Sequence, residues 1–157
     1  MAVGRYFNVG PLTLPEWKHA LGTDVQKSTD PKAIVAYLTS LGMSVDARQP
    51  MTLDDLSAAT AAGKPVIVCC QDYGPEVPRG AEFAYGHYLT VIGRGMGYIF
   101  VQDSSADNVV GNSGSDEAPG RVMIRDADFD KLWHDRDEAG NQYDHWGVVV
   151  GPTETVA

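Results

Sequence analysis

The sequence predicts an α+β fold in which N-terminal helices pack on a C-terminal antiparallel sheet. Apolar residues recur at helical spacing between positions 14 and 63, whereas apolar runs rich in β-branched residues dominate after position 64. With 157 residues and 43% hydrophobic content, the chain is long enough to bury one core. It has no internal repeat and no linker composition, so residues 1–157 are expected to form a single domain.

Three helices are expected in the first part of the chain, over residues 14–22, 30–42 and 52–63. Leu14 and Trp17 share one face of the first of them. Asp30 and Thr52 are residue types that cap helix N-termini, and Pro31 suits the first turn of the second helix. Each range ends in a glycine, where helices commonly stop.

Five strands are expected after position 64, over residues 65–71, 87–93, 98–103, 122–124 and 146–150. A glycine-rich turn at residues 93–97 makes the second and third of these antiparallel neighbours. Phe129 and Trp133 indicate a short helix before the last strand. Residues 104–120 hold many Ser, Asp, Asn and Gly without periodicity, so we expect a long surface loop there.

Composition argues against several classes of partner. The formal net charge is −9, whereas nucleic acids and anionic membranes attract clustered Lys and Arg, so we expect neither as the main partner. No apolar run is long enough to span a membrane, and residues 1–10 do not resemble a secretory signal. The only cysteines, Cys69 and Cys70, are adjacent, and a disulfide bond between adjacent cysteines is strained. We therefore expect no disulfide bond, which fits a reducing compartment. The cytoplasm is therefore the default location.

A histidine and an aspartate are expected at one edge of the sheet. His87 begins the strand 87–93, and Asp103 ends the next strand. A tight turn between antiparallel strands places the start of one beside the end of the other, so the two side chains can meet. The carboxylate can then fix the imidazole tautomer and leave the second ring nitrogen as a base. A purely structural hydrogen bond is the alternative interpretation.

Several segments carry a family resemblance. The most specific are Gly86-His87-Tyr88-Leu89-Thr90-Val91-Ile92-Gly93 and Val101-Gln102-Asp103. Others are Leu21-Gly22-Thr23, Thr29-Asp30-Pro31, Leu41-Gly42, Gly63-Lys64-Pro65-Val66-Ile67-Val68 and Trp146-Gly147-Val148-Val149-Val150. In these segments the chain resembles the papain-like cysteine peptidases, and most closely their bacteriocin-processing branch.

This resemblance implies a papain-like fold, with His87 as the catalytic base and Asp103 as the residue that orients it. It also implies that the end of the strand 65–71 and the start of the next strand line a substrate pocket, which makes Gln71, Gly86 and Tyr88 candidate substrate-binding residues. The expected substrate is a peptide or a small acyl compound.

The family's nucleophile is a cysteine at the start of an N-terminal helix, preceded by a glutamine. Here Arg5-Tyr6-Phe7 resembles the end of that helix, and neither residue type precedes it. We therefore expect that the segment carrying the nucleophile is missing from this sequence. Loss of a helix from the core would expose apolar surface, so a homodimer is also expected.

Cys69 and Cys70 are the remaining candidates for a nucleophile. They end a strand that we expect to pair with the strand of His87, and alternation places only one of them on the His87 face. A thiol beside the imidazole could form a thiolate pair. Burial of both as small apolar side chains is the alternative.

We expect no bound metal ion, and calcium is the one metal ion that the sequence leaves open. The stretch from Asp103 through Asp107 to Asp116 and the acidic residues between 126 and 137 are rich in carboxylates, but neither matches the calcium-loop pattern. The histidines and cysteines lack zinc-ligand spacing. No other cofactor is implied.

Two functional hypotheses follow. In the first, the chain is a cysteine-peptidase-like hydrolase that cleaves amide or related acyl bonds, using His87 with Asp103 and either a cysteine or a His-activated water. In the second, it is a catalytically inactive peptidase-like domain that binds a peptide or a protein partner.

Overall fold

The computed structural model describes residues 2–11, 13–23, 28–71, 86–104, 120–137 and 139–153. The helices in these ranges are α1 (Ala2–Phe7), α2 (Leu14–Leu21), α3 (Pro31–Ser40), α4 (Leu53–Ala61) and α5 (Asp126–Leu132). The strands are β1 (Ser44–Arg48), β2 (Val66–Gln71), β3 (Gly86–Gly95), β4 (Tyr98–Gln102), β5 (Arg121–Arg125), β6 (His134–Arg136), β7 (Gln142–Asp144) and β8 (Gly147–Gly151). The predicted α+β class is confirmed.

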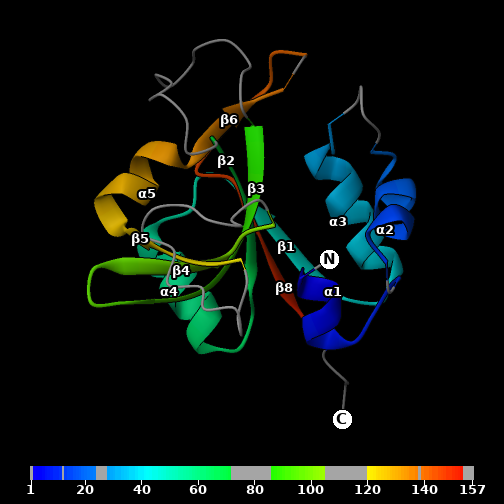
Figure 1. Cartoon of the computed structure of the whole chain (residues 1–157), viewed down its shortest axis with the longest axis horizontal. Coiled ribbons are helices and arrows are strands. Elements are labelled where there is room, and N and C mark those ends of the chain that lie inside the picture. The colour runs from blue at the N-terminus through cyan, green and yellow to red at the C-terminus, as the bar shows by residue number, and fades with distance from the viewer. Residues whose placement is uncertain are drawn as a thin grey trace.

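Strands of the described ranges form a six-stranded antiparallel sheet in the order β1-β8-β2-β3-β4-β5 (Figure 1). A separate two-stranded sheet joins β6 to β7. The predicted hairpin between β3 and β4 is present, and Gly97 takes a positive φ of 79° in its turn. The start of β3 and the end of β4 therefore lie at the same edge of the sheet, as the site prediction requires.

Helices cover both faces of the sheet, with α2 and α3 on one side and α4 and α5 on the other (Figure 1). Alternation along the strands divides the buried side chains between these two layers. On β8, Val148 and Val150 pack with the α2–α3 layer, whereas Val149 packs with the α4–α5 layer. This division decides which functional candidates can share a face.

The predicted helix caps are present. The Asp30 carboxylate accepts a hydrogen bond from the Lys32 main-chain N–H at 2.8 Å. Thr52 and Asp55 form a reciprocal capping box at the start of α4. Gly22 ends α2 with a φ of 66°, the left-handed conformation that glycine adopts at low cost.

The expectation that helices alone fill the first half is wrong, because β1 pairs with β8 between α3 and α4. Its sequence, Ser-Val-Asp-Ala-Arg, is mostly polar, and only Val45 is half-buried. Because only one residue of this edge strand is covered, its sequence shows almost no alternation of apolar and polar residues. Strands β6 and β7 were also not predicted, and each has only three residues. Residues 105–119 of the expected loop lie outside the described ranges.

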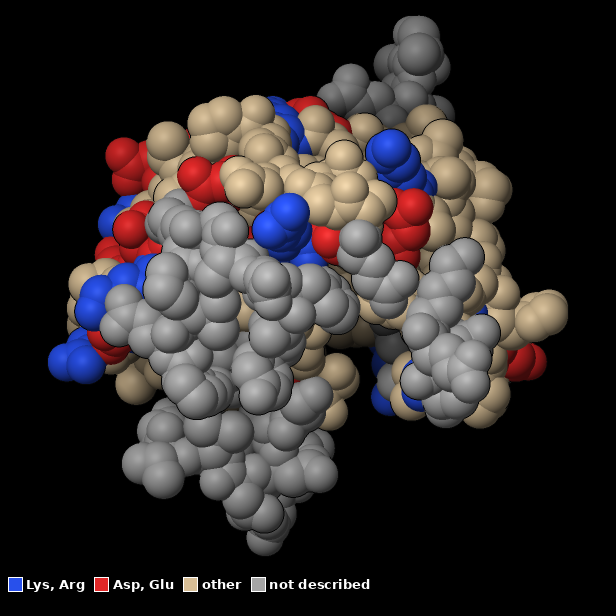
Figure 2. Space-filling model, turned by 90° about the horizontal axis from the view of Figure 1, so that it is seen from above, with Lys and Arg blue, Asp and Glu red and all other residues tan. Residues whose placement is uncertain are grey.

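The surface mixes both signs of charge. On the face seen in Figure 2, acidic and basic side chains lie beside one another rather than in separate areas. Although the net charge is −9, this face therefore has no large area that is only acidic. Among the described residues, no helix has the length and apolar character needed to cross a membrane.

Candidate functional site

The candidate site lies where β2 ends and β3 begins. The register of this pair places Cys70 opposite His87 and Gln71 opposite Gly86. Cross-strand partners point to the same face of a sheet, so Cys70 and His87 share a face. Cys69 belongs to the opposite face, where it packs with the α2–α3 layer.

The structure brings His87 and Asp103 together. His87 Nε2 lies 2.7 Å from Asp103 Oδ1. The Asp103 side chain is fully buried, and 15% of the His87 side chain is exposed. The Asp103 main-chain N–H donates to the Gly120 carbonyl oxygen at 2.6 Å, which holds the residue at the end of β4. An ionised carboxylate only accepts hydrogen bonds, so the tautomer that matches this contact carries its proton on Nε2 and has Nδ1 as its basic nitrogen.

Cys70 is close to His87 but is inaccessible. It has 0% exposure and packs with the α4–α5 layer. Its thiol donates to the main-chain carbonyl oxygen of His87 at 3.5 Å. A side chain buried to this degree reaches a substrate carbonyl only if the end of β2 opens.

Cys69 contacts a carboxylate on the other face. Its Sγ donates to Asp135 Oδ2 at 3.1 Å. Burial, and then the negative charge of Asp135, raises the pKa of the Cys69 thiol. The thiol is therefore protonated near neutral pH, and the strand separates it from His87.

Asp135 is the site residue that sequence reasoning missed. It lies on β6, and its Oδ1 accepts hydrogen bonds from Gln71 Nε2 at 2.9 Å and from the Arg136 main-chain N–H at 2.8 Å. Burial raises the pKa of its carboxyl group. In the sequence it was grouped only with other acidic residues, because a strand as short as β6 gives no periodic signal.

The three predicted substrate-binding residues differ in accessibility. Gly86 is exposed, whereas Gln71 is buried and Tyr88 is half-buried. The Tyr88 hydroxyl donates to the Thr29 carbonyl oxygen at 2.8 Å, which ties β3 to the segment before α3. Burial raises the pKa of the Tyr88 phenol, so this hydroxyl remains a donor near neutral pH.

Gly86 allows Asp135 to approach closely. A Cβ at position 86 would lie 2.6 Å from Asp135 Oδ2, well inside van der Waals contact. We predict that Gly86→Ala displaces the carboxylate and lowers the free energy of unfolding by about 1–3 kcal/mol. Gly93→Ala on the same strand is the matched control, since its Cβ would meet Phe100 at an ordinary 3.7 Å. Urea unfolding of both variants checks the prediction, and equal losses would contradict it.

Among the described residues, no group of three or more His, Cys, Asp or Glu side chains is arranged to hold a metal ion. Asp103, the described member of the calcium candidates, is bound to His87, and Asp107 lies outside the described residues. Several residues of the acidic group beyond position 125 contact cations instead: Arg94 contacts Asp126, and Arg125 contacts Asp128.

Comparison with known proteins identifies the fold. No protein-family model matches the sequence, and no curated protein matches it. The structure is similar to the crystal structure of the peptidase domain of Streptococcus ComA, a bifunctional ABC transporter involved in a quorum-sensing pathway. The TM-score is 0.62 at 14% sequence identity, and the match covers 96% of this chain and 85% of that one. The chain therefore has the fold of a peptidase domain, as predicted.

Proposed function

We propose that this domain is a hydrolase of the cysteine-peptidase type, acting on amide or related acyl bonds. The observation that carries the proposal is the 2.7 Å contact between His87 Nε2 and the buried Asp103 carboxylate. The peptidase-domain fold supports it. Asp103 fixes the tautomer and the orientation of the ring, and His87 Nδ1 acts as the base.

The proposed reaction needs one proton acceptor and one nucleophile. His87 Nδ1 takes the proton of a thiol or of a water molecule, and the resulting thiolate or hydroxide adds to the substrate carbonyl carbon. The C–N or C–O bond then breaks, and the leaving group receives the proton from His87. With a thiol, the product of this step is a thioester; His87 then deprotonates a water molecule, the hydroxide adds to the thioester carbon, the C–S bond breaks and the thiol recovers its proton.

Cys70 and water are the two nucleophiles that we consider further. Cys70 lies directly opposite His87 and on the same face, which favours it over Cys69. Its complete burial favours water, which needs no movement of β2. Gln71 plays no part in this step, because its side chain binds Asp135 on the Cys69 face and its Oε1 is buried.

A non-catalytic peptide-binding domain is the second candidate function. The observation that favours it is the state of the two cysteines: both are buried, and the pKa of Cys69 is raised. Under this alternative the polar groups around Gln71 and Asp135 would hold a bound peptide without cleaving it.

Hydrolysis assays on purified variants separate these functions. Wild-type protein is incubated with fluorogenic peptide and ester substrates beside His87→Ala, Cys70→Ala and Cys69→Ala. The proposal expects turnover that His87→Ala abolishes and Cys69→Ala preserves. Loss in Cys70→Ala identifies a thiol nucleophile, and retention identifies water. Turnover that is unchanged in His87→Ala would exclude the proposed mechanism.

Thiol labelling gives an independent prediction. Because burial shields both thiols and raises the pKa of Cys69, we expect native Cys69 to react with iodoacetamide at pH 8 at least about 100-fold more slowly than the unfolded chain. Mass spectrometry of the labelled peptide measures the rate. Fast labelling of Cys70 alone would show that β2 opens and would favour Cys70 as the nucleophile. Fast labelling of Cys69 would contradict the expectation.

A further inference from the structure

A pocket opens beside the start of α4, away from His87 and Asp103. Its volume is about 530 Å³, within the range of about 300–1,000 Å³ that is usual for small-molecule sites. Arg94 lines it from the far end of β3, seven residues beyond His87. At ~3.3 Å of strand per residue, about 20 Å separates the two places.

The base of this pocket is apolar and firmly held. Met51 has 2% exposure, and Leu53 packs against the α4–α5 layer of the core. The Met51 main-chain N–H donates to the His145 carbonyl oxygen at 2.9 Å, which joins two segments of the lining. Such a base suits the methylene groups of a ligand.

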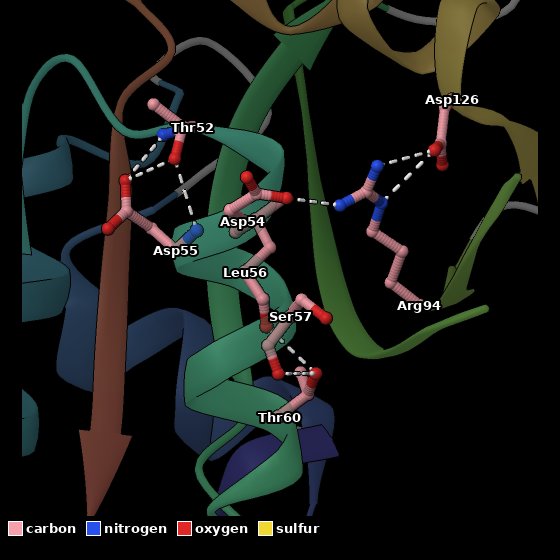
Figure 3. A network of polar contacts seen from close by, with 8 residues as sticks. All are labelled: Thr52, Asp54, Asp55, Leu56, Ser57, Thr60, Arg94 and Asp126. Atoms are coloured by element: carbon pink, nitrogen blue, oxygen red, sulfur yellow. Dashed lines mark hydrogen bonds and ion pairs between the residues drawn. The ribbon is translucent and has the colours of Figure 1, made fainter.

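Two residues of the lining, Asp54 and Arg94, belong to an ion-pair network that continues to Asp126 (Figure 3). Arg94 Nη1 donates to Asp54 Oδ1 at 2.8 Å, and Arg94 Nε and Nη2 both donate to Asp126 Oδ2, at 3.1 and 2.8 Å. The guanidinium is thus directed at two carboxylates. The Asp54 side chain is 94% exposed, so it also faces solvent at the pocket.

Asp130 adds a third carboxylate. It lines the pocket from α5, and its Oδ1 lies 3.0 Å from His145 Nε2. Its side chain is 53% exposed. Asp54 and Asp130 line the pocket together with Arg94 and His145, and Arg94 is also bound by Asp126 outside the lining. Carboxylates therefore outnumber the single guanidinium, and their field favours a cation.

We propose that this pocket binds an organic cation with a short apolar stem, the chemistry of an alkylammonium or of a lysine side chain. The stem packs on Met51 and Leu53, and the ammonium group contacts Asp54 and Asp130. The size of the pocket, its apolar base and the excess of carboxylates each favour this class. The proposal does not depend on hydrolysis by the His87 site.

Butylammonium chloride is the probe, followed by two-dimensional 1H–15N NMR of the full chain. We expect saturable shifts at the amides of Leu53, Asp54, Arg94 and His145. The double variant Asp54→Asn/Asp130→Asn should weaken binding at least tenfold. Asp128→Asn is the matched control, because it removes a charge from the same helix as Asp130, and Asp128 is not part of the pocket lining. Circular dichroism confirms that the variants are folded.

Sodium butyrate separates recognition of charge from recognition of the stem. The proposal expects butyrate to bind at least tenfold more weakly than butylammonium, because it carries the same stem with the opposite charge. Equal binding of the two ions would overturn the proposal, as would unchanged affinity in the folded double variant. The absence of any saturable shift at the pocket amides would overturn it as well.

Discussion

Replacing Asp103 with asparagine is expected to lower the rate constant of hydrolysis by about 10³–10⁴-fold. In the proposed mechanism the Asp103 carboxylate, 2.7 Å from His87 Nε2, accepts a hydrogen bond from that nitrogen and keeps the proton on it. An asparagine amide can instead donate to Nε2, which would move the ring proton to Nδ1 and remove the base. The change nearly preserves the shape of the side chain, so the loss reports on the tautomer rather than on packing.

Asp144→Asn is the matched control for this experiment. Asp144 Oδ1 also contacts a histidine, lying 3.4 Å from His145 Nδ1, but it is 53% exposed and on β7. We expect its activity to stay within about twofold of the wild type. Steady-state kinetics on both variants, with circular dichroism to confirm folding, completes the test. If Asp103→Asn kept full activity, Asp103 would be a structural partner of His87 and the proposed mechanism would be wrong.

The meeting of His87 and Asp103 could be predicted because it depends on local features. A glycine-rich turn fixes the pairing of β3 with β4, and pairing fixes which strand ends meet. The opposite placement of Cys69 and Cys70 follows from alternation in the same way. In each case a short-range rule determines the relative positions of the side chains.

The contact between Asp135 and the end of β2 could not be predicted, because it joins residues far apart in the sequence. Asp135 reaches Cys69 and Gln71 across 66 and 64 positions, through a three-residue strand. No local pattern reports such a contact, and an aspartate is usually solvated. The pairing of β1 with β8 could not be predicted for a related reason. The residues of β1 are mostly polar, and they form a strand because β8 lies beside them rather than because of their own pattern.

Replacing Trp133 with alanine is expected to lower the free energy of unfolding by about 3–5 kcal/mol. The side chain is fully buried, and its Nε1–H donates to the Trp146 carbonyl oxygen at 2.9 Å. Its ring also meets Phe129, with centroids 5.2 Å apart, and His145, at 4.7 Å. The variant therefore leaves a cavity and an unsatisfied buried carbonyl oxygen.

Thermal unfolding measures this loss. For a chain of this size, ~4 kcal/mol corresponds to a fall in Tm of about 10 °C. Met96→Ala is the control, because Met96 is 94% exposed and its truncation should change stability by less than ~0.5 kcal/mol. Trp133→Phe should fall between the two, since it keeps an aromatic ring but loses the indole N–H.

The same variant tests whether the core supports the candidate site. Trp133 comes just before β6, the strand that carries Asp135 to Cys69. If Trp133 holds β6 in place, Trp133→Ala should speed the labelling of Cys69 under conditions where the variant is still folded, because Asp135 would no longer cover the thiol. Met96→Ala should leave the labelling rate unchanged. A destabilised variant with slow labelling would show instead that β6 is held by its pairing with β7 and its contacts with β2, and not by Trp133.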